Sequence, residues 1–97
     1  METLHFHYEA RQPLTRRAHV GVVSSGDLEV LIEPSNQPST QVRVRTSVDG
    51  FAHVWKRLLD QFFTQFDHAA TIEINDFGAT PGTVSLRLEQ AAELLRS

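Results

Sequence analysis

The sequence contains no cysteine, and Lys56 is its only lysine. Without cysteine the chain has no disulfide framework, no thiol nucleophile and no thiolate metal site, so any thiol chemistry must come from a bound group. A general nucleic-acid binder needs clustered lysine and arginine to contact phosphates, whereas this chain has a net charge of −3. The composition therefore argues against a nucleic-acid partner.

Long apolar runs are also absent. No segment approaches the roughly 18 apolar residues of a membrane-spanning helix, and the start of the chain, METLHFHYEARQ, lacks both a basic beginning and an unbroken apolar stretch. We therefore expect a soluble, cytoplasmic protein without a membrane span. With 97 residues, of which 40% are hydrophobic, the chain is large enough to bury one core as a single domain, residues 1–97.

The most informative stretch is residues 20–34, VGVVSSGDLEVLIEP. Two segments rich in β-branched residues flank SSGD, a composition typical of a tight hairpin turn between two strands. Gly26 has no Cβ, so the backbone can adopt a positive φ there and a bulky reagent can approach the hydroxyl of Ser25. The turn therefore makes Ser25 an accessible acceptor, although serines in turns also serve simply to cap backbone groups.

Three motifs together indicate a family. SGDLEVLIEP occupies residues 25–34, TSVD occupies residues 46–49, and NDFGATPG occupies residues 75–82. With these motifs the chain resembles, over nearly its whole length, the acyl carrier (delta) subunit of malonate decarboxylase and, more distantly, the acyl carrier of citrate lyase. One position differs, because the family has glycine before its attachment serine and this chain has Ser24.

In that family the serine before Gly-Asp carries 2′-(5″-phosphoribosyl)-3′-dephospho-coenzyme A through a phosphodiester. The resemblance therefore implies that Ser25 is the attachment residue and that Gly26 and Asp27 complete the cofactor-binding site. It also implies that the chain itself contributes no catalytic and no metal-binding residue.

The function implied by the resemblance is that of a non-catalytic acyl carrier subunit. A prosthetic-group transferase attaches the arm, and the carrier then presents acetyl and malonyl thioesters to the transferase and decarboxylase subunits of malonate decarboxylase, whose groups perform the chemistry. The carrier contributes tethering, which raises the effective concentration of the thioester at each partner's site. Its docking contacts are expected around Ser25, Asp27 and the loop at residues 76–82.

Alternating apolar residues predict strands over much of the chain. The first strand has Leu4, Phe6 and Tyr8 on its inward side and ends before Pro13. The inward residues of the other predicted strands are Ala18, Val20 and Val22; Leu28, Val30 and Ile32; Val42, Val44 and Thr46; Ile72 and Ile74; and Val84, Leu86 and Leu88. Residues 89–95 change to a helical composition, so the last strand is expected to lead into a short terminal helix.

Residues 51–66 show the clearest helical pattern. Large apolar side chains recur at i, i+3, i+4, i+7, i+8, i+11, i+12 and i+15, namely Phe51, Val54, Trp55, Leu58, Leu59, Phe62, Phe63 and Phe66. Ser47 or Asp49 can cap the start of this helix. Core packing is the expected role of the apolar stripe, and an aromatic ligand-binding surface is the alternative.

These elements predict an α+β fold: a mainly antiparallel sheet of about five or six strands, with one long amphipathic helix across one face and a short C-terminal helix. This differs from the four-helix fold of ordinary acyl carriers. The chain also lacks their Asp-Ser-Leu attachment signature, because Ser25 lies between Ser24 and Gly26.

Two pairs of basic or titratable residues have more than one interpretation. His5 and His7 share a strand face, where they can bind a metal or serve as exposed polar positions. Arg43 and Arg45 can hold phosphates of the attached arm. The alternative for the arginines is an ion pair across the sheet with Glu29 or Glu33 of the third strand.

Two other classes of function stay open. A small adaptor domain would use exposed Val23 and Leu31 at an interface, and SSGD would be a simple turn. A hydrolase would combine Ser25 with His19 and Asp27, but the sequence has no GxSxG elbow and residues so close along a hairpin rarely form a triad. Intact mass separates the three classes, because only a carrier bears a stable large adduct.

Overall fold

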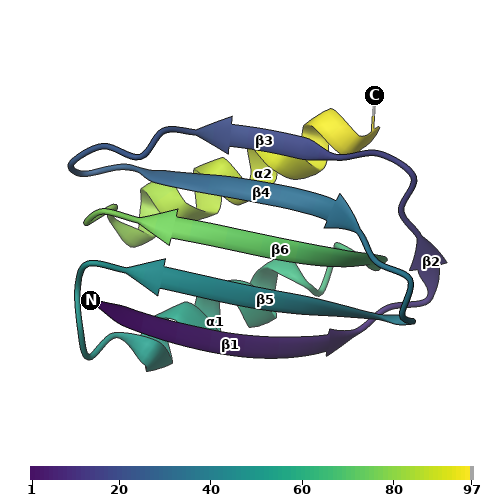
Figure 1. The fold of residues 1–97 in the computed structure, drawn as a ribbon, viewed down its shortest axis with the longest axis horizontal. Coiled ribbons are helices and arrows are strands. Elements are labelled where there is room, and N and C mark those ends of the chain that lie inside the picture. Colours follow the sequence, from purple (N-terminus) through teal and green to yellow (C-terminus); the bar gives the residue numbers. More distant parts are fainter. Residues whose placement is uncertain (97) are drawn as a thin grey trace.

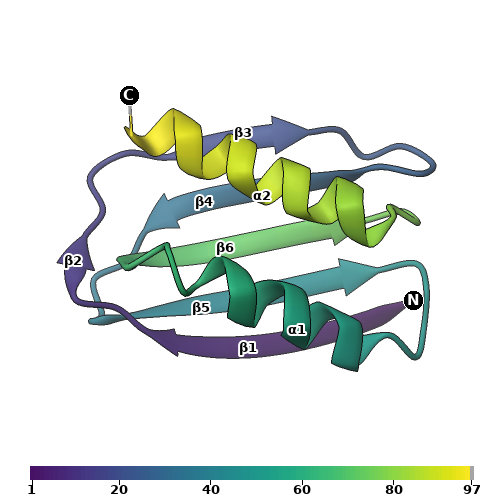
Figure 2. The ribbon, with the colours of Figure 1, turned by 180° about the vertical axis from the view of Figure 1, so that it is seen from behind.

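The computed structural model describes residues 1–96, which form one six-stranded sheet with two helices on the same face (Figure 1, Figure 2). The strands are β1 (Glu2–Glu9), β2 (Gln12–Pro13), β3 (Ala18–Gly21), β4 (Leu28–Pro34), β5 (Ser39–Thr46) and β6 (His68–Asp76). The helices are α1 (Ala52–Phe62) and α2 (Pro81–Arg96).

The strands lie in the order β1-β5-β6-β4-β3, and β2 pairs with the beginning of β6. The pairs β1–β5, β6–β4 and β4–β3 are antiparallel, but β5–β6 and β2–β6 are parallel. The helix between β5 and β6 is the reason for their direction, because α1 returns the chain to the end where β5 began. The sheet is therefore mixed, and the predicted mainly antiparallel arrangement is wrong.

The predicted long helix across the sheet is also wrong. α1 has 11 residues and ends at Phe62, and the next three residues form turns. Phe66 lies beyond the helix but is still buried in the core. The apolar pattern therefore extends past the end of the helix, which is why it predicted a longer one. Phe51 precedes the helix and no side chain caps it, so neither Ser47 nor Asp49 has the predicted capping role.

The C-terminal helix replaces a predicted strand and is not short. α2 has 16 residues, and its buried side chains have helical spacing: Val84, Leu88, Ala91 and Ala92. Leu86, predicted to face inward from a strand, is 54% exposed. Val84 and Leu88 are four residues apart, a separation that both a strand face and a helix face repeat, so the local alternation was ambiguous.

The core lies between the sheet and the two helices. The inward residues predicted for the three central strands are confirmed, since each of the following is at most 1% exposed: Leu28, Val30, Ile32, Val42, Val44, Thr46, Ile72 and Ile74. The apolar ones pack against Trp55, Leu59 and Phe62 of α1 and against α2. A fully buried side chain of this size contributes about 1.5–3 kcal/mol, so this layer is the main source of folding energy.

The face of the sheet opposite the helices is polar. Arg43 of β5 forms an ion pair with Glu73 of β6, and Arg45 Nη1 lies 3.7 Å from Glu73 Oε1. An ion pair across the sheet was therefore predicted correctly in kind, but its predicted partners Glu29 and Glu33 were wrong. They lie on β4, which β6 separates from β5.

His5 and His7 both lie exposed on β1. Nδ1 of His7 contacts the side-chain amide of Gln41 on β5. Residues 1–96 contain no cluster of three histidine, aspartate or glutamate side chains that could hold a metal ion. No helix in this part of the chain is both long and apolar enough to cross a bilayer.

Candidate functional site

Ser24 and Ser25 lie in a loop, residues 22–27, that connects β3 to β4 (Figure 1). This segment, called the serine loop below, is longer than the predicted tight turn because β3 ends at Gly21, where φ is +81°. A Cβ at Gly21 would lie 2.0 Å from the carbonyl oxygen of Leu28, so a larger residue does not fit. Val22, predicted to continue the strand, is 57% exposed.

A second glycine shapes the tip of the serine loop. The amide of Asp27 donates a 3.1 Å hydrogen bond to the carbonyl of Ser24, which closes a turn. Within this turn Gly26 has a φ of +78°, a value that L side chains rarely adopt. Apart from its two neighbours in the chain, a Cβ on Gly26 would meet no atom within 4 Å, so the space at Gly26 is open.

The backbone of the serine loop is attached to the loop between β6 and α2. The amide of Gly26 donates to the carbonyl of Phe77 at 2.7 Å, and the amide of Phe77 donates to the carbonyl of Asp27 at 3.0 Å. These two bonds extend the β4–β6 pairing past the last paired residues of the strands, Leu28 and Asp76. The residue after Ser25 is therefore held by main-chain hydrogen bonds.

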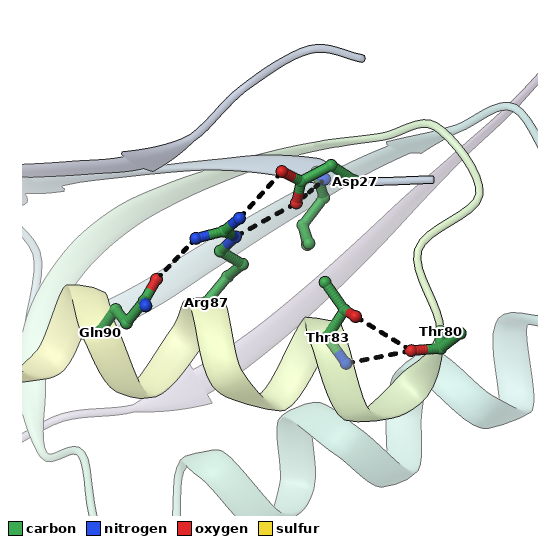
Figure 3. A network of polar contacts seen from close by, with 6 residues as sticks. Asp27, Thr80, Thr83, Arg87 and Gln90 are labelled. Atoms are coloured by element: carbon green, nitrogen blue, oxygen red, sulfur yellow. Dashed lines mark hydrogen bonds and ion pairs between the residues drawn. The ribbon is translucent and has the colours of Figure 1, made fainter. Parts of the chain in front are cut away.

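Asp27 attaches the same loop to α2 (Figure 3). Its carboxylate accepts hydrogen bonds from Arg87 Nε at 3.1 Å and Nη2 at 2.9 Å, and from the amide of Leu28 at 2.7 Å. The Arg87 bonds, followed by the Leu28 amide, lower the pKa of Asp27. Gln90 in turn accepts a 3.0 Å bond from Arg87 Nη1, which orients the guanidinium.

The two serine hydroxyls, unlike the Asp27 carboxylate, make no hydrogen bonds to residues 1–96. Ser24 and Ser25 are both exposed, and within residues 1–96 neither hydroxyl has a hydrogen-bond partner. The structure therefore does not show these side chains capping backbone groups. What it shows is a pair of free hydroxyls on a loop whose next two residues are fixed, an arrangement that suits a group-transfer acceptor.

The residues of the hypothetical triad are not assembled. His19 lies on β3, where its Nε2 is 3.0 Å from Glu29 Oε2. The Asp27 carboxylate is occupied by Arg87, and Ser25 is bonded to neither residue. Nothing in this arrangement activates Ser25 as a nucleophile in turnover.

A hollow of about 250 Å³ lies beside the serine loop, lined by Met1, Val23, Arg45, Asn75 and Phe77. It combines one guanidinium, one side-chain amide and one aromatic ring. The Asn75 amide donates to the Glu29 carboxylate at 2.9 Å, which fixes its direction. Of the two arginines considered from sequence, the structure brings Arg45 into this hollow.

Sequence reasoning missed Arg87 and Phe77 as parts of the site. Arg87 was missed because residues 83–88 were interpreted as a strand, and a strand would not have carried its side chain back to Asp27. The backbone of Phe77 is bonded to the serine loop and the residue also lines the hollow, and no sequence pattern reports either contact. The family resemblance suggested that the motif NDFGATPG lies near the carrier site or a partner subunit, and the structure places its residue Phe77 against the serine loop.

Comparison with known proteins agrees with this geometry. Residues 15–95 match the family model described as Malonate decarboxylase delta subunit (MdcD). The chain is 51% identical to the malonate decarboxylase acyl carrier protein of Azotobacter vinelandii, over 96% of this chain and 95% of that one. It is 53% identical, with the same coverage, to the protein of that name from Pseudomonas syringae pv. tomato.

A solved structure has the same fold. It is a chain in the crystal structure of a Pseudomonas malonate decarboxylase hetero-tetramer in complex with malonate, with a TM-score of 0.93 and 51% sequence identity. The match covers 98% of this chain and 99% of that chain. Because sequence and structure both match over nearly the full length, the chain belongs to the malonate decarboxylase delta subunit family.

Proposed function

We propose that this chain is the acyl carrier subunit of a malonate decarboxylase and that Ser25 is the residue to which its prosthetic group is attached. The observation that carries the assignment of the site is the serine loop, which presents a free, exposed hydroxyl directly before two anchored residues, Gly26 and Asp27. Family membership and the names of the relatives support the carrier role.

The proposed prosthetic group is 2′-(5″-phosphoribosyl)-3′-dephospho-coenzyme A, joined to Ser25 by a phosphodiester. The residues around the serine loop fit such a group. Its nucleotide portion carries phosphates and an aromatic base, and the hollow beside Val23 offers the Arg45 guanidinium for the former and the Phe77 ring for the latter. The open space at Gly26 leaves room for the first phosphoribosyl unit.

When attached, the group supplies the thiol that this chain lacks, on which acetyl and malonyl groups are carried as thioesters. The chain's own residues provide a fixed base for the arm. Hydrogen bonds at Gly26 and ion pairing at Asp27 restrain the residues beside Ser25, so the arm pivots from a defined point. We assign Asp27 this positioning role in the cofactor site. Tethering then raises the effective concentration at each partner's active site.

The chemistry belongs to the partners in this proposal. A prosthetic-group transferase loads Ser25, and transferase and decarboxylase subunits of the complex act on the carried acyl groups in the cytoplasm. We place the docking surface around Ser25 and the neighbouring loop, residues 76–82. Val22 and Val23 are adjacent and both exposed, so they extend this surface with an apolar patch of the kind that marks interaction sites.

Intact mass spectrometry tests the assignment. The full chain, incubated with the prosthetic-group precursor and its transferase, should gain one arm, and peptide mapping should place it on Ser25. Ser25→Ala should fold normally and gain no mass, while the matched control Ser24→Ala should still be modified. A phosphodiester mapped to Ser24, or a Ser25→Ala protein that supports malonate decarboxylation, would overturn the assignment.

A further inference from the structure

An apolar cavity of about 310 Å³ lies between the first turns of α1 and α2. Its wall includes Trp55, and its rim includes Val48 and Phe51. Phe51 is 47% exposed and Val48 is 39% exposed, so two large apolar side chains stand in water at its mouth. Together with the apolar lining they form a continuous apolar surface, which is the kind of surface that binds an apolar group.

The connection between β6 and α2 contacts both the cavity and the serine loop. Gly78 and Ala79, which line it, directly follow Phe77, whose backbone exchanges hydrogen bonds with Gly26 and Asp27. Figure 2 shows that both helices begin at the end of the sheet where the β3–β4 connection lies. A flexible arm on Ser25 therefore begins next to the segment that lines this cavity.

The polar groups of the cavity are already satisfied. Thr46 Oγ1 donates to Asp76 Oδ2 at 2.8 Å, and the amide of Ala79 donates to Asp76 Oδ1 at 3.0 Å. Asp76 is 4% exposed. The described lining contains no lysine, arginine or histidine, so it offers apolar contacts and one buried carboxylate but no cationic side chain.

We propose that this cavity receives the acyl end of the arm when it carries an acetyl group and excludes it when it carries a malonyl group. The inference rests on the proposed function. A methyl group gains by leaving water for an apolar cavity. The terminal carboxylate of a malonyl group would lose its hydration without a cationic partner, next to Asp76, which makes its entry unfavourable. The acetyl form is thus shielded, and the malonyl form stays in solvent, available to a partner.

Cleavage of the loaded thioester by hydroxylamine tests the proposal on the full chain. Val54 lines the cavity and is half-buried, so Val54→Phe should fill it. Cleavage of the acetyl form, followed by intact mass, should be about fourfold faster in Val54→Phe than in the parent. This factor is the ratio that corresponds to the free energy of burying one methyl-sized group. Cleavage of the malonyl form should not change. Leu86→Phe, on the exposed side of α2, is the control and should leave both rates unchanged.

Trp55 provides a second readout, because it is the only tryptophan and lies in the cavity wall. Acetylation of the arm should shift the Trp55 emission, while malonylation should leave it near that of the unloaded chain. If Val54→Phe does not fold, Val48→Phe at the exposed rim replaces it. The proposal would be overturned if the ratio of the Val54→Phe rate to the parent rate were the same for the acetyl and malonyl forms and acetylation left the Trp55 emission unchanged. The same mass spectra report whether an arm is present. A missing arm would contradict the proposed function, whereas an arm whose acetyl group is not shielded would contradict only the proposed role of the cavity.

Discussion

Arg87 holds both carboxylate oxygens of Asp27, with Nε 3.1 Å from Oδ1 and Nη2 2.9 Å from Oδ2, although the two residues are 60 positions apart. The pair joins the residue that follows Ser25-Gly26 to the middle of α2. Both side chains are partly shielded, at 27% exposed for Arg87 and 18% for Asp27, and the geometry is bidentate. Such a pair restrains a loop better than an exposed single contact does.

Removal of the guanidinium should therefore loosen the serine loop. In Arg87→Gln, the amide of Gly26, which donates to Phe77, should exchange with deuterium several-fold faster than in the parent. Amides of β4 should not change. The control is Arg96→Gln, which removes an exposed arginine paired with Glu93 near the end of α2. Equal exchange at Gly26 in both variants would show that the ion pair does not restrain the loop.

Acid should remove the same contribution. Because Arg87 lowers the pKa of folded Asp27 below its ordinary 3.8, the unfolded chain binds the proton first. The stabilisation is therefore complete above pH 3.8 and is lost as the pH falls from that value through the lower folded pKa. The difference in unfolding free energy between the parent and Asp27→Asn should be constant above this window and should shrink as the pH falls through it. Urea titrations across the range measure it, and a difference that grew towards acid pH would contradict the assignment.

The two glycines that flank the serines should respond differently to alanine. Gly26→Ala should cost about 1–2 kcal/mol, because only its positive φ is unfavourable and a Cβ has open space. Gly21→Ala should cost about 2–5 kcal/mol, because its Cβ would also collide with the Leu28 carbonyl. Chemical denaturation compares them, and equal losses would show that the backbone of β3 relaxes around the methyl group.

The choice between the serines has its own test. Ser24→Gly restores the glycine expected before the attachment serine, so the prosthetic group should be attached at least as fast as in the parent. A slower attachment, measured by intact mass over time, would show that the Ser24 side chain takes part in loading. Because both hydroxyls are exposed, burial alone does not distinguish them, and rate is the informative measurement.

Partner docking should depend on the apolar part of the serine loop. Val22→Asp should leave attachment of the arm intact but lower malonate turnover of the reconstituted complex several-fold, because a carboxylate would replace an apolar contact. Leu86→Asp, with a similarly exposed side chain on α2, is the control. Charge reversal at Asp27 is a poorer test of docking, since it breaks the Arg87 contact as well. Normal turnover in Val22→Asp would place the docking surface elsewhere.

Local pattern was sufficient for much of this protein. The alternation in β4 and β5 correctly predicted which side chains are buried, because a strand exposes every second residue to one face whatever its neighbours are. The position of Ser25 before Gly26 and the positive φ at that glycine also followed from sequence, since both depend on a few consecutive residues. The family resemblance rests on the same short motifs.

Tertiary structure decided the rest. In residues 83–88, the buried Val84 and Leu88 are four positions apart, which fits one face of a strand and one face of a helix equally well. Packing against the sheet selected the helix. The parallel pairing of β5 and β6 could not be predicted from either segment alone, because it depends on which strands become neighbours in the sheet. Asp27 and Arg87 meet for the same reason. Their contact depends on how β4 and α2 are placed on either side of the core, so the anchored state of the serine loop is a property of the whole fold.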